Sequence, residues 1–391
     1  MKKNIRFVKT ASLVMAVSLL LAAAPIGPRD GGFASPLGGV ALASSEKPVK
    51  TYTFEEVGAI AQQNSSDIIR QKVAVDQAEN SKESSLDNLS AQSYNFYADP
   101  ESGIKEEMLY SLQDSYESAV TSWEDAEETL KKLKPKVAYQ AQKLYLDILQ
   151  TELQITIQEK EIVRLKDEYE LAKAKAAFGA FTQTQLRNAK NQWESAVDTL
   201  ESLQSSLKTS KNSMREYLNL ADDVDFALAD PPVFGEYTKE FDDKEVLSDA
   251  LRNSMSLKQA KREVDELAKK VHNLEIQGDY DQARRLQVTS TTRDLSLKET
   301  QQTLTRTVEN LMQDFHGLDE ALEKAKDALY AAQRALISIR LKQNLGTSTI
   351  NELRQAEKTV LAAEKDVLQA QYNCYLVAKK VALMKDGVLV N

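Results

Sequence analysis

The sequence predicts an all-α fold: an elongated bundle of six long antiparallel coiled-coil helices, arranged as two tandem three-helix repeats with no β-barrel. One observation is a short phrase that occurs twice, in Gly179–Ala189 and Gly346–Ala356, with Gly, Thr, Leu, Arg and Ala at the same offsets. Another is that the segments 57–72 and 246–261 also run in parallel. Third, Gly and Pro are sparse after residue 50, where Ala, Leu, Glu, Lys and Gln dominate. A repeated unit of this kind constrains the fold more than any single residue does.

Helix-breaking residues set the expected boundaries of the first repeat. We expect helices over residues 54–92, 106–177 and 182–220, separated by a turn at Asp99–Gly103 and another at Gly179. Pro135 lies inside the second of these helices and is expected to kink or break it near Leu133, because proline lacks an N–H donor and clashes with the preceding turn.

The second repeat follows the same plan. Its helices are expected over residues 243–276, 281–344 and 349–385, with turns at Gly278 and Gly346. The run around Pro231 and Pro232 is the clearest linker. The predicted organisation is therefore a leader (1–43), a first helical repeat (44–229), a linker (230–242) and a second helical repeat (243–391).

Apolar residues within these helices recur at intervals of three, four and seven, which is typical of a coiled-coil seam. In the first repeat the series is Leu144, Ile148, Ile155, Ile162, Leu165 and Tyr169, and in the second it is Leu329, Leu336, Ile339 and Leu345. A helix of about 65 residues is roughly 100 Å long, so it has to lie along partners over its whole length.

The repeated phrase predicts a specific turn. Gly179 and Gly346 can take the left-handed conformation that ends a helix. Thr182 and Thr349 can then cap the next helix, with Gln185 and Glu352 completing the two capping boxes. Leu186 and Leu353, with Ala189 and Ala356, begin the apolar stripe of each outgoing helix. A well-formed helical hairpin accounts for all of these residues without any further role.

The first 43 residues have the composition of a signal peptide. Lys2, Lys3 and Arg6 precede an apolar run from Ala11 to Ala24, and Ala41–Ala43 is a small-x-small cleavage site that would leave Ser44 first. A cut after Ala24 and an uncleaved anchor are the alternatives. We expect an exported protein, with no membrane-spanning segment in the mature chain.

Composition argues against several classes of function. The formal net charge is −9, so no basic face for nucleic acid is expected. His272 and His316 are far apart, and Cys374 is a single cysteine that we interpret as a small core residue. No nucleotide-binding or nucleophile motif occurs. We therefore predict no enzyme, no catalytic residue, no metal site and no cofactor.

At the repeated residues the chain resembles the TolC family of outer-membrane efflux and secretion channels. The resemblance covers most of the mature chain and includes the pattern Ala61-x-x-Asn64-x-x-x-Ile68, repeated from Ala250. In that family three chains form a helical tunnel whose hairpin tips dock an adaptor and a transporter. The resemblance thus implies docking tips at Gly179, Thr182, Gln185, Leu186, Gly346, Thr349, Glu352 and Leu353.

Two features depart from the family pattern. Family members insert a pair of amphipathic strands between the first and second helix of each repeat, but residues 89–108 and 274–295 lack the alternating polarity of such strands. The resemblance therefore applies to the helical part alone. Family members can also carry acidic side chains six positions after each turn glycine; here those positions are Gln185 and Glu352, and capping explains Glu352 by itself.

Two functional hypotheses follow. The chain is a component of an efflux or secretion conduit, self-associating as a trimer and docking a periplasmic adaptor or transporter through its tips; or it is an exported coiled-coil scaffold that does not conduct. A self-contained monomeric bundle is a third, weaker interpretation. The expected location is the periplasm or cell envelope, associated with the outer membrane if the cell has one, and otherwise the extracytoplasmic face or the cell wall.

Overall fold

The computed structural model describes residues 50–98, 105–221, 224–229 and 241–390. The chain divides into two units, residues 1–47 and 48–391, and the description below concerns the second. The predicted signal peptide, the turn at residues 99–103 and most of the linker at 230–242 lie outside the described residues.

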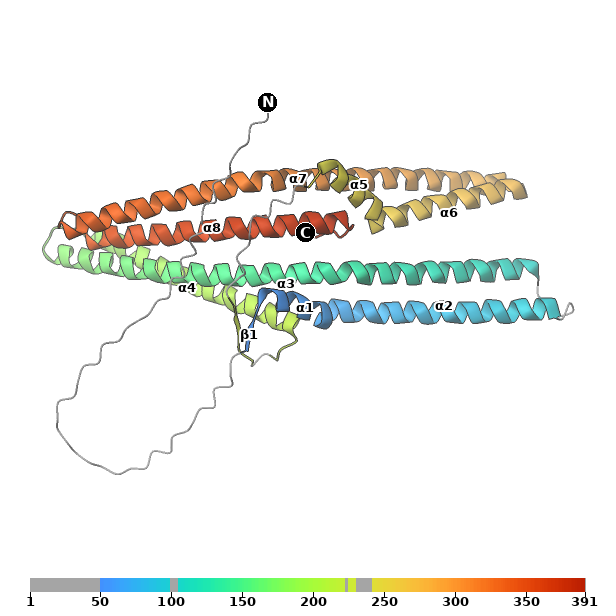
Figure 1. Ribbon diagram of the computed structural model, residues 1–391, viewed down its shortest axis with the longest axis horizontal. Helices are drawn as coiled ribbons and strands as arrows, with labels where there is room; N and C mark the ends of the chain where they lie inside the picture. Colours follow the sequence, from blue (N-terminus) through green and yellow to red (C-terminus); the bar gives the residue numbers. More distant parts are fainter. Residues whose placement is uncertain (1–49, 99–104, 222–223, 230–240, 391) are drawn as a thin grey trace, which may run out of the picture. The chain divides into compact units, whose positions relative to one another are not determined.

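The described residues form the predicted helical fold, with the same order of helices in each repeat (Figure 1). The elements are β1 (Lys50–Tyr52), α1 (Phe54–Asn64), α2 (Ser66–Ala98), α3 (Glu106–Ala177), α4 (Gln183–Leu218), β2 (Phe226–Leu228), α5 (Asp243–Asn253), α6 (Met255–Gln277), α7 (Tyr280–Asn344) and α8 (Ile350–Lys385). The main neighbouring pairs are α2 with α3, α3 with α4, α6 with α7, and α7 with α8.

The first predicted helix of each repeat is in fact two helices. Residues 54–92 were expected to be continuous, but α1 ends at Asn64 and α2 starts at Ser66; likewise α5 and α6 meet at Ser254. Ser254 has extended backbone angles, and its hydroxyl accepts a hydrogen bond from the Leu257 N–H at 3.4 Å. The break follows from this cap, because a serine hydroxyl can satisfy an amide that a continuous helix would pair with a carbonyl.

Pro135 does not break the long helix. α3 continues through it from Glu106 to Ala177. Leu133 on one side and Val137 on the other both pack into the same hydrophobic core. Burial on both sides of the proline offsets the lost backbone hydrogen bond, so tertiary packing overrides the local preference.

The region around residue 280 is helical, as expected from the lack of a strand pattern in residues 274–295. α6 ends at Gln277, Gly278 takes a φ of +82°, and Asp279 caps α7. The two helices are therefore joined by a two-residue turn.

A short parallel strand pair was not predicted. Lys50 to Tyr52 of β1 pair with Phe226 to Leu228 of β2. The Tyr145 hydroxyl of α3 donates to the backbone oxygens of Ala229, at 2.5 Å, and Tyr52, at 3.3 Å. These contacts attach both ends of the first repeat to the middle of α3.

Two hydrophobic clusters lie where the short helices α1 and α5 pack. α1 contacts α3 and α4, and α5 contacts α7 and α8. The first cluster contains Phe54, Val57, Val137, Tyr145, Ile148, Met214 and Tyr372. The second contains Val246, Ala250, Val308, Leu311, Val381 and Met384. Because Tyr372 belongs to α8, the first cluster also joins the two repeats.

The C-terminal tail turns back after α8. Gly387 has a φ of +73°, and a Cβ built on it would lie 2.1 Å from the backbone oxygen of Asn253. Beyond it, Val388 and Val390 are buried with Tyr139 and Leu383. Only glycine fits this turn, because it combines left-handed backbone with contact against the α5–α6 junction.

Gly387→Ala is expected to destabilise the protein more than Gly346→Ala. Both residues have positive φ, so both variants incur about 1–2 kcal/mol of backbone strain. Gly346 has open space around its Cβ position, whereas Gly387 would also meet the Asn253 carbonyl. Chemical denaturation of the two variants measures the difference. Equal destabilisation would show that the tail does not pack against Asn253.

Candidate functional site

The first helical tip has the predicted conformation. Gly179 has a φ of +74°, and the Ala180 N–H donates to the Lys175 carbonyl at 2.8 Å. The Thr182 hydroxyl accepts from the Gln185 N–H at 3.2 Å, and the Gln185 side chain accepts from the Thr182 N–H at 2.9 Å. The left-handed glycine and the capping box are thus both confirmed.

The second tip repeats this geometry. Gly346 has a φ of +70°, and Thr349 and Glu352 form the reciprocal capping box at 3.2 and 3.0 Å. The Ser348 hydroxyl also donates to Glu352 at 2.5 Å. This hydrogen bond, followed by that from the Thr349 backbone, lowers the pKa of the Glu352 carboxyl. Glu352 is therefore engaged in the cap, as expected from its position.

The most exposed apolar side chains at the tips lie just before the glycines. Phe178 is 89% exposed and Leu345 is 78% exposed. The predicted residues Leu186 and Leu353 are only partly exposed, because they start the stripes that face into each hairpin. Neither residue was predicted as part of a tip, and Leu345, predicted to lie in the coiled-coil seam of the second repeat, is too exposed to belong to it. The signal was present: a large apolar residue precedes the turn glycine in both copies.

Each hairpin is held together near its tip by apolar contacts of its own. In the first, the rings of Tyr169 and Trp193 stack with centroids 5.8 Å apart. In the second, Ala332 of α7 packs with Val360 and Ala363 of α8. Each tip is therefore supported independently of the other hairpin.

Besides the apolar clusters near the middle of α3, polar contacts join α3 of the first hairpin to α8 of the second. Along α8 the residues Arg354, Lys358, Lys365 and Lys379 reach Asp167, Glu161, Gln154 and Gln142 of α3, in that order. Lys358 lies 3.0 Å from Glu161, and Lys365 donates to Gln154 at 3.1 Å. As residue numbers rise along α8, the numbers of the partner residues on α3 fall, so the two helices run antiparallel. The four bases come from α8, and their partners on α3 are two carboxylates and two neutral glutamine amides, so the seam is complementary in hydrogen bonding and partly in charge.

Glu161 is the central acid of this seam. Arg164 of the same helix donates to both its carboxylate oxygens, at 2.8 Å each, and Lys358 approaches from α8. The Arg164 hydrogen bond is the main reason that the pKa of Glu161 falls from 4.5 to about 2, although burial opposes the change. The Glu161 side chain is 13% exposed, so this pair is shielded from solvent better than ordinary surface pairs.

The described residues offer little support for other kinds of site. Among them, no three His, Cys, Asp or Glu side chains gather as metal ligands would. His316 instead lies 2.9 Å from Asp243. Searched helix by helix, this part of the chain contains no stretch with both the length and the apolarity that crossing a membrane requires.

Comparison with known proteins gives a likeness in structure only. The sequence matches no protein-family model and no curated protein. The outer-membrane channel OprN superposes with a TM-score of 0.61 at 13% identity, covering 93% of this chain and 99% of the channel. The CmeC outer-membrane channel of Campylobacter jejuni gives 0.61 at 11% identity, covering 92% and 94%. This chain has the fold of outer-membrane channels.

A third structure, of CusC, gives a TM-score of 0.59 at 11% identity and covers 85% of this chain and 92% of CusC. The fold implied by the resemblance to the TolC family is therefore confirmed. At 11–13% identity the likeness shows the fold and does not extend to activity.

Glu161→Gln is expected to lower stability at neutral pH and to have less effect in acid. The folded pKa is depressed, so the stabilisation is fully present above the unfolded value of 4.5 and disappears as pH falls towards about 2. The shift corresponds to a loss on the order of 3 kcal/mol at pH 7. Urea denaturation across this range measures it. The control is Glu170→Gln, because the Glu170–Lys173 pair is exposed; equal losses for both variants would contradict a special role for Glu161.

Proposed function

We propose that the protein is an exported, TolC-like component of an efflux or secretion conduit in the cell envelope, and that it docks partners through its two helical tips. The observation that carries this proposal is the exposure of Phe178 and Leu345 at two turns of identical geometry. A single exposed Phe or Leu is ordinary on a protein surface, and it is the recurrence of the same exposure at the same place in two copies of one turn that supports a shared binding surface.

The contact chemistry of the tips fits a protein partner. Burying an exposed Phe or Leu contributes roughly 1.5–3 kcal/mol, so a single tip binds weakly. The glycines leave open space beside these side chains, so a partner helix can approach the turn closely. If several copies of the chain present tips side by side, the weak contacts combine through effective concentration.

The remaining expectations belong to this proposal. We propose membership of the TolC family, self-association as a trimer, and a periplasmic adaptor or transporter as partner. The mature chain starts near Ser44 and carries repeats at 44–229 and 243–391 with the linker 230–242 between them. It is located in the periplasm or cell envelope, associated with the outer membrane if the cell has one. It has no enzymatic activity.

A non-conducting scaffold is the second candidate. The direct turn from α6 to α7 through Gly278 and Asp279 favours it, because that end of the second repeat consists of two helices and their connection. A scaffold would use the same tips for capture without forming a continuous passage.

The double variant Phe178→Ser/Leu345→Ser is expected to lose partner capture while retaining helicity, because both side chains are exposed and make little contribution to the core. Photo-crosslinkers placed at Ala180 and Thr347, followed by mass spectrometry of proteins crosslinked in the native cell, identify what the tips touch. Val288→Ser is the matched control, since Val288 is 69% exposed but lies near the opposite end of α7. Equal crosslinking with and without the tip substitutions would overturn the docking proposal.

The conduit predicts a defined oligomer of the purified mature chain. Light scattering coupled to size-exclusion chromatography should give three times the mass of one chain, with a concentration-dependent shift at low micromolar protein. A monomer at all concentrations, in detergent and without it, would contradict the conduit and favour the scaffold.

A further inference from the structure

The two repeats also meet away from the tips, where their outer hairpins leave the core. We call the hairpin of α2 with residues 106–134 of α3 the first arm, and that of α6 with residues 280–303 of α7 the second arm. Within each arm the two helices pack against each other. Among the described residues, no hydrophobic cluster joins α3 to α6.

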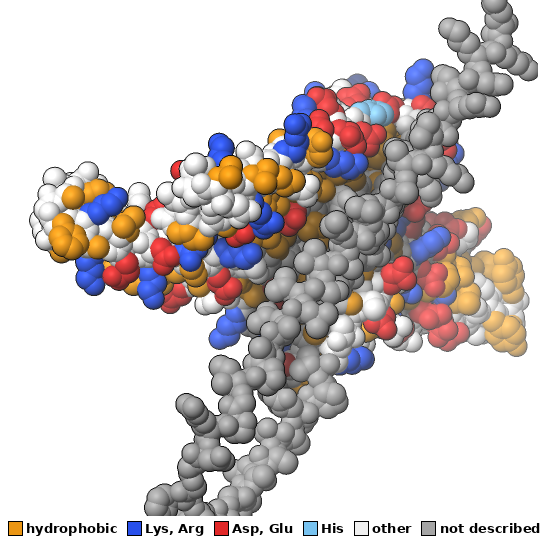
Figure 2. Space-filling view, turned by 60° about the vertical axis from the view of Figure 1, so that its left-hand side comes forward, with side chains coloured by type: hydrophobic (Ala, Val, Ile, Leu, Met, Phe, Trp, Pro, Cys, Tyr) orange, Lys and Arg blue, Asp and Glu red, His pale blue; other side chains and the backbone are white. Residues whose placement is uncertain are grey.

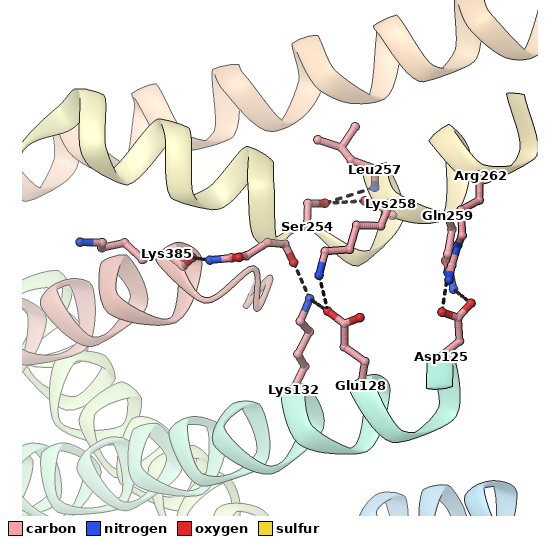
Figure 3. Close-up of polar contacts among 11 residues, drawn as sticks. Asp125, Glu128, Lys132, Ser254, Leu257, Lys258, Gln259, Arg262 and Lys385 are labelled. Atoms are coloured by element: carbon pink, nitrogen blue, oxygen red, sulfur yellow. Dashed lines mark hydrogen bonds and ion pairs between the residues drawn. The ribbon is translucent and has the colours of Figure 1, made fainter. Parts of the chain in front are cut away.

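Long polar side chains bridge the arms instead (Figure 3). Asp125 of α3 accepts hydrogen bonds from Arg262 and, at 3.1 Å, from Gln259 of α6. One turn further along α3, Glu128 accepts from Lys258 of α6 at 2.9 Å. The contacts again place acids on α3 and bases on the second repeat. We refer to Asp125, Glu128, Lys258, Gln259 and Arg262 as the arm bridge.

The arm bridge adjoins the break between α5 and α6. Lys132, which also pairs with Glu128 at 2.8 Å, donates to the Asn253 carbonyl at 2.5 Å (Figure 3). The Asn253 side chain donates to the Lys385 carbonyl at 2.7 Å. Ser254 is at once the C-cap of α5 and the N-cap of α6, so a single residue separates the two helices.

The two sides of this break are held differently. On the α5 side, Val246 and Ala250 are almost fully buried against α7 and α8. On the α6 side, Leu257 still belongs to the same hydrophobic cluster, but the bridge to α3 beside and beyond it is open to water: Lys258 is 44% exposed, Arg262 38%, Glu128 29% and Asp125 24%. Charged side chains of both signs are also exposed elsewhere on the face drawn in Figure 2. The exposed charges of the arm bridge differ because they link α3 to α6.

Solvent exposure makes the bridge sensitive to salt. The Debye length is about 30 Å at 0.01 M salt and about 3 Å at 1 M, so exposed ion pairs are screened while apolar contacts persist. Salt therefore weakens the arm bridge without loosening the core that anchors α5 or the packing within each arm. α7 is continuous from the arm into the core, so it would bend as α6 turns at Ser254.

We propose that the arm bridge is an electrostatic catch that sets the separation of the two arms. With the catch closed, α6 lies against α3; with the ion pairs screened or neutralised, α6 turns about Ser254 and the arms move apart while α5 stays in the core. This device concerns the hairpins opposite the tips and does not depend on the proposed docking function.

Spin-label distances test the catch in the purified full mature chain. Labels at Ser115→Cys and Ala268→Cys, both exposed and one on each arm, are introduced in a Cys374→Ala background. Labelled protein is diluted with unlabelled protein so that only distances within one chain are read. We expect a short, narrow distance in low salt and a longer, broader one at about 1 M NaCl. A second pair, Ala268→Cys with Ser296→Cys, lies within the second arm and should not change.

Neutralisation should reproduce the effect of salt. Asp125→Asn/Glu128→Gln is expected to give the long distance even in low salt, and the exchange Asp125→Arg/Arg262→Asp should restore the short one. Circular dichroism establishes that the variants remain helical; if either fails to fold, the salt titration of the unsubstituted bridge decides by itself. A between-arm distance that is independent of salt would overturn the proposal. So would a salt-induced change that appears equally in the within-arm pair.

Discussion

The length of the two longest helices, α3 and α7, is the constraint on which the rest of the structure depends. α3 has 72 residues and is therefore about 108 Å long, so its apolar positions can be buried only along neighbouring helices. α2 and α4 cover it in succession, one towards each end. The same requirement applies to α7 with α6 and α8. The breaks at Ser65 and Ser254 fit this plan, because they let the short helices α1 and α5 leave the line of the arms and fill the centre.

Apolar contacts dominate at the centre of the molecule, whereas polar contacts join the two repeats towards the tips and in the arms. Within hairpins, apolar contacts such as that between Ala332 and Val360 persist in salt, although exposed ion pairs such as that of Arg340 with Glu357 also join the two helices. Near the tips and in the arms the contacts between repeats are ionic, as between Lys358 and Glu161. Near the middle of α3 the described repeats share two apolar clusters, one that contains Tyr145 and Tyr372 and a smaller one that contains Tyr139 and Leu383. The molecule is thus two self-supporting hairpin pairs fastened by apolar packing at the centre and by charge elsewhere.

Local capping and periodicity were sufficient to predict much of the fold. The αL glycines, both capping boxes and the paired long helices follow from residue types at fixed spacing, which act over one or two turns. The continuity of α3 through Pro135 and the β1–β2 pair could not be predicted, because both depend on contacts with distant residues such as Tyr52 and Tyr145. The polar seam between α3 and α8 could not be predicted either, since partners such as Asp167 and Arg354 are far apart in sequence.

The candidate site illustrates the same limit. Sequence repetition identified the turns correctly but directed attention to Leu186 and Leu353, whose spacing makes them helix-stripe residues. Such residues are committed to their own hairpin and have little surface left for a partner. Phe178 and Leu345 lie just after the last helical residue of their turns, where no element of the described chain covers them. Where two turns of the same geometry both leave a large apolar side chain in water, a shared partner surface explains the exposure better than packing does.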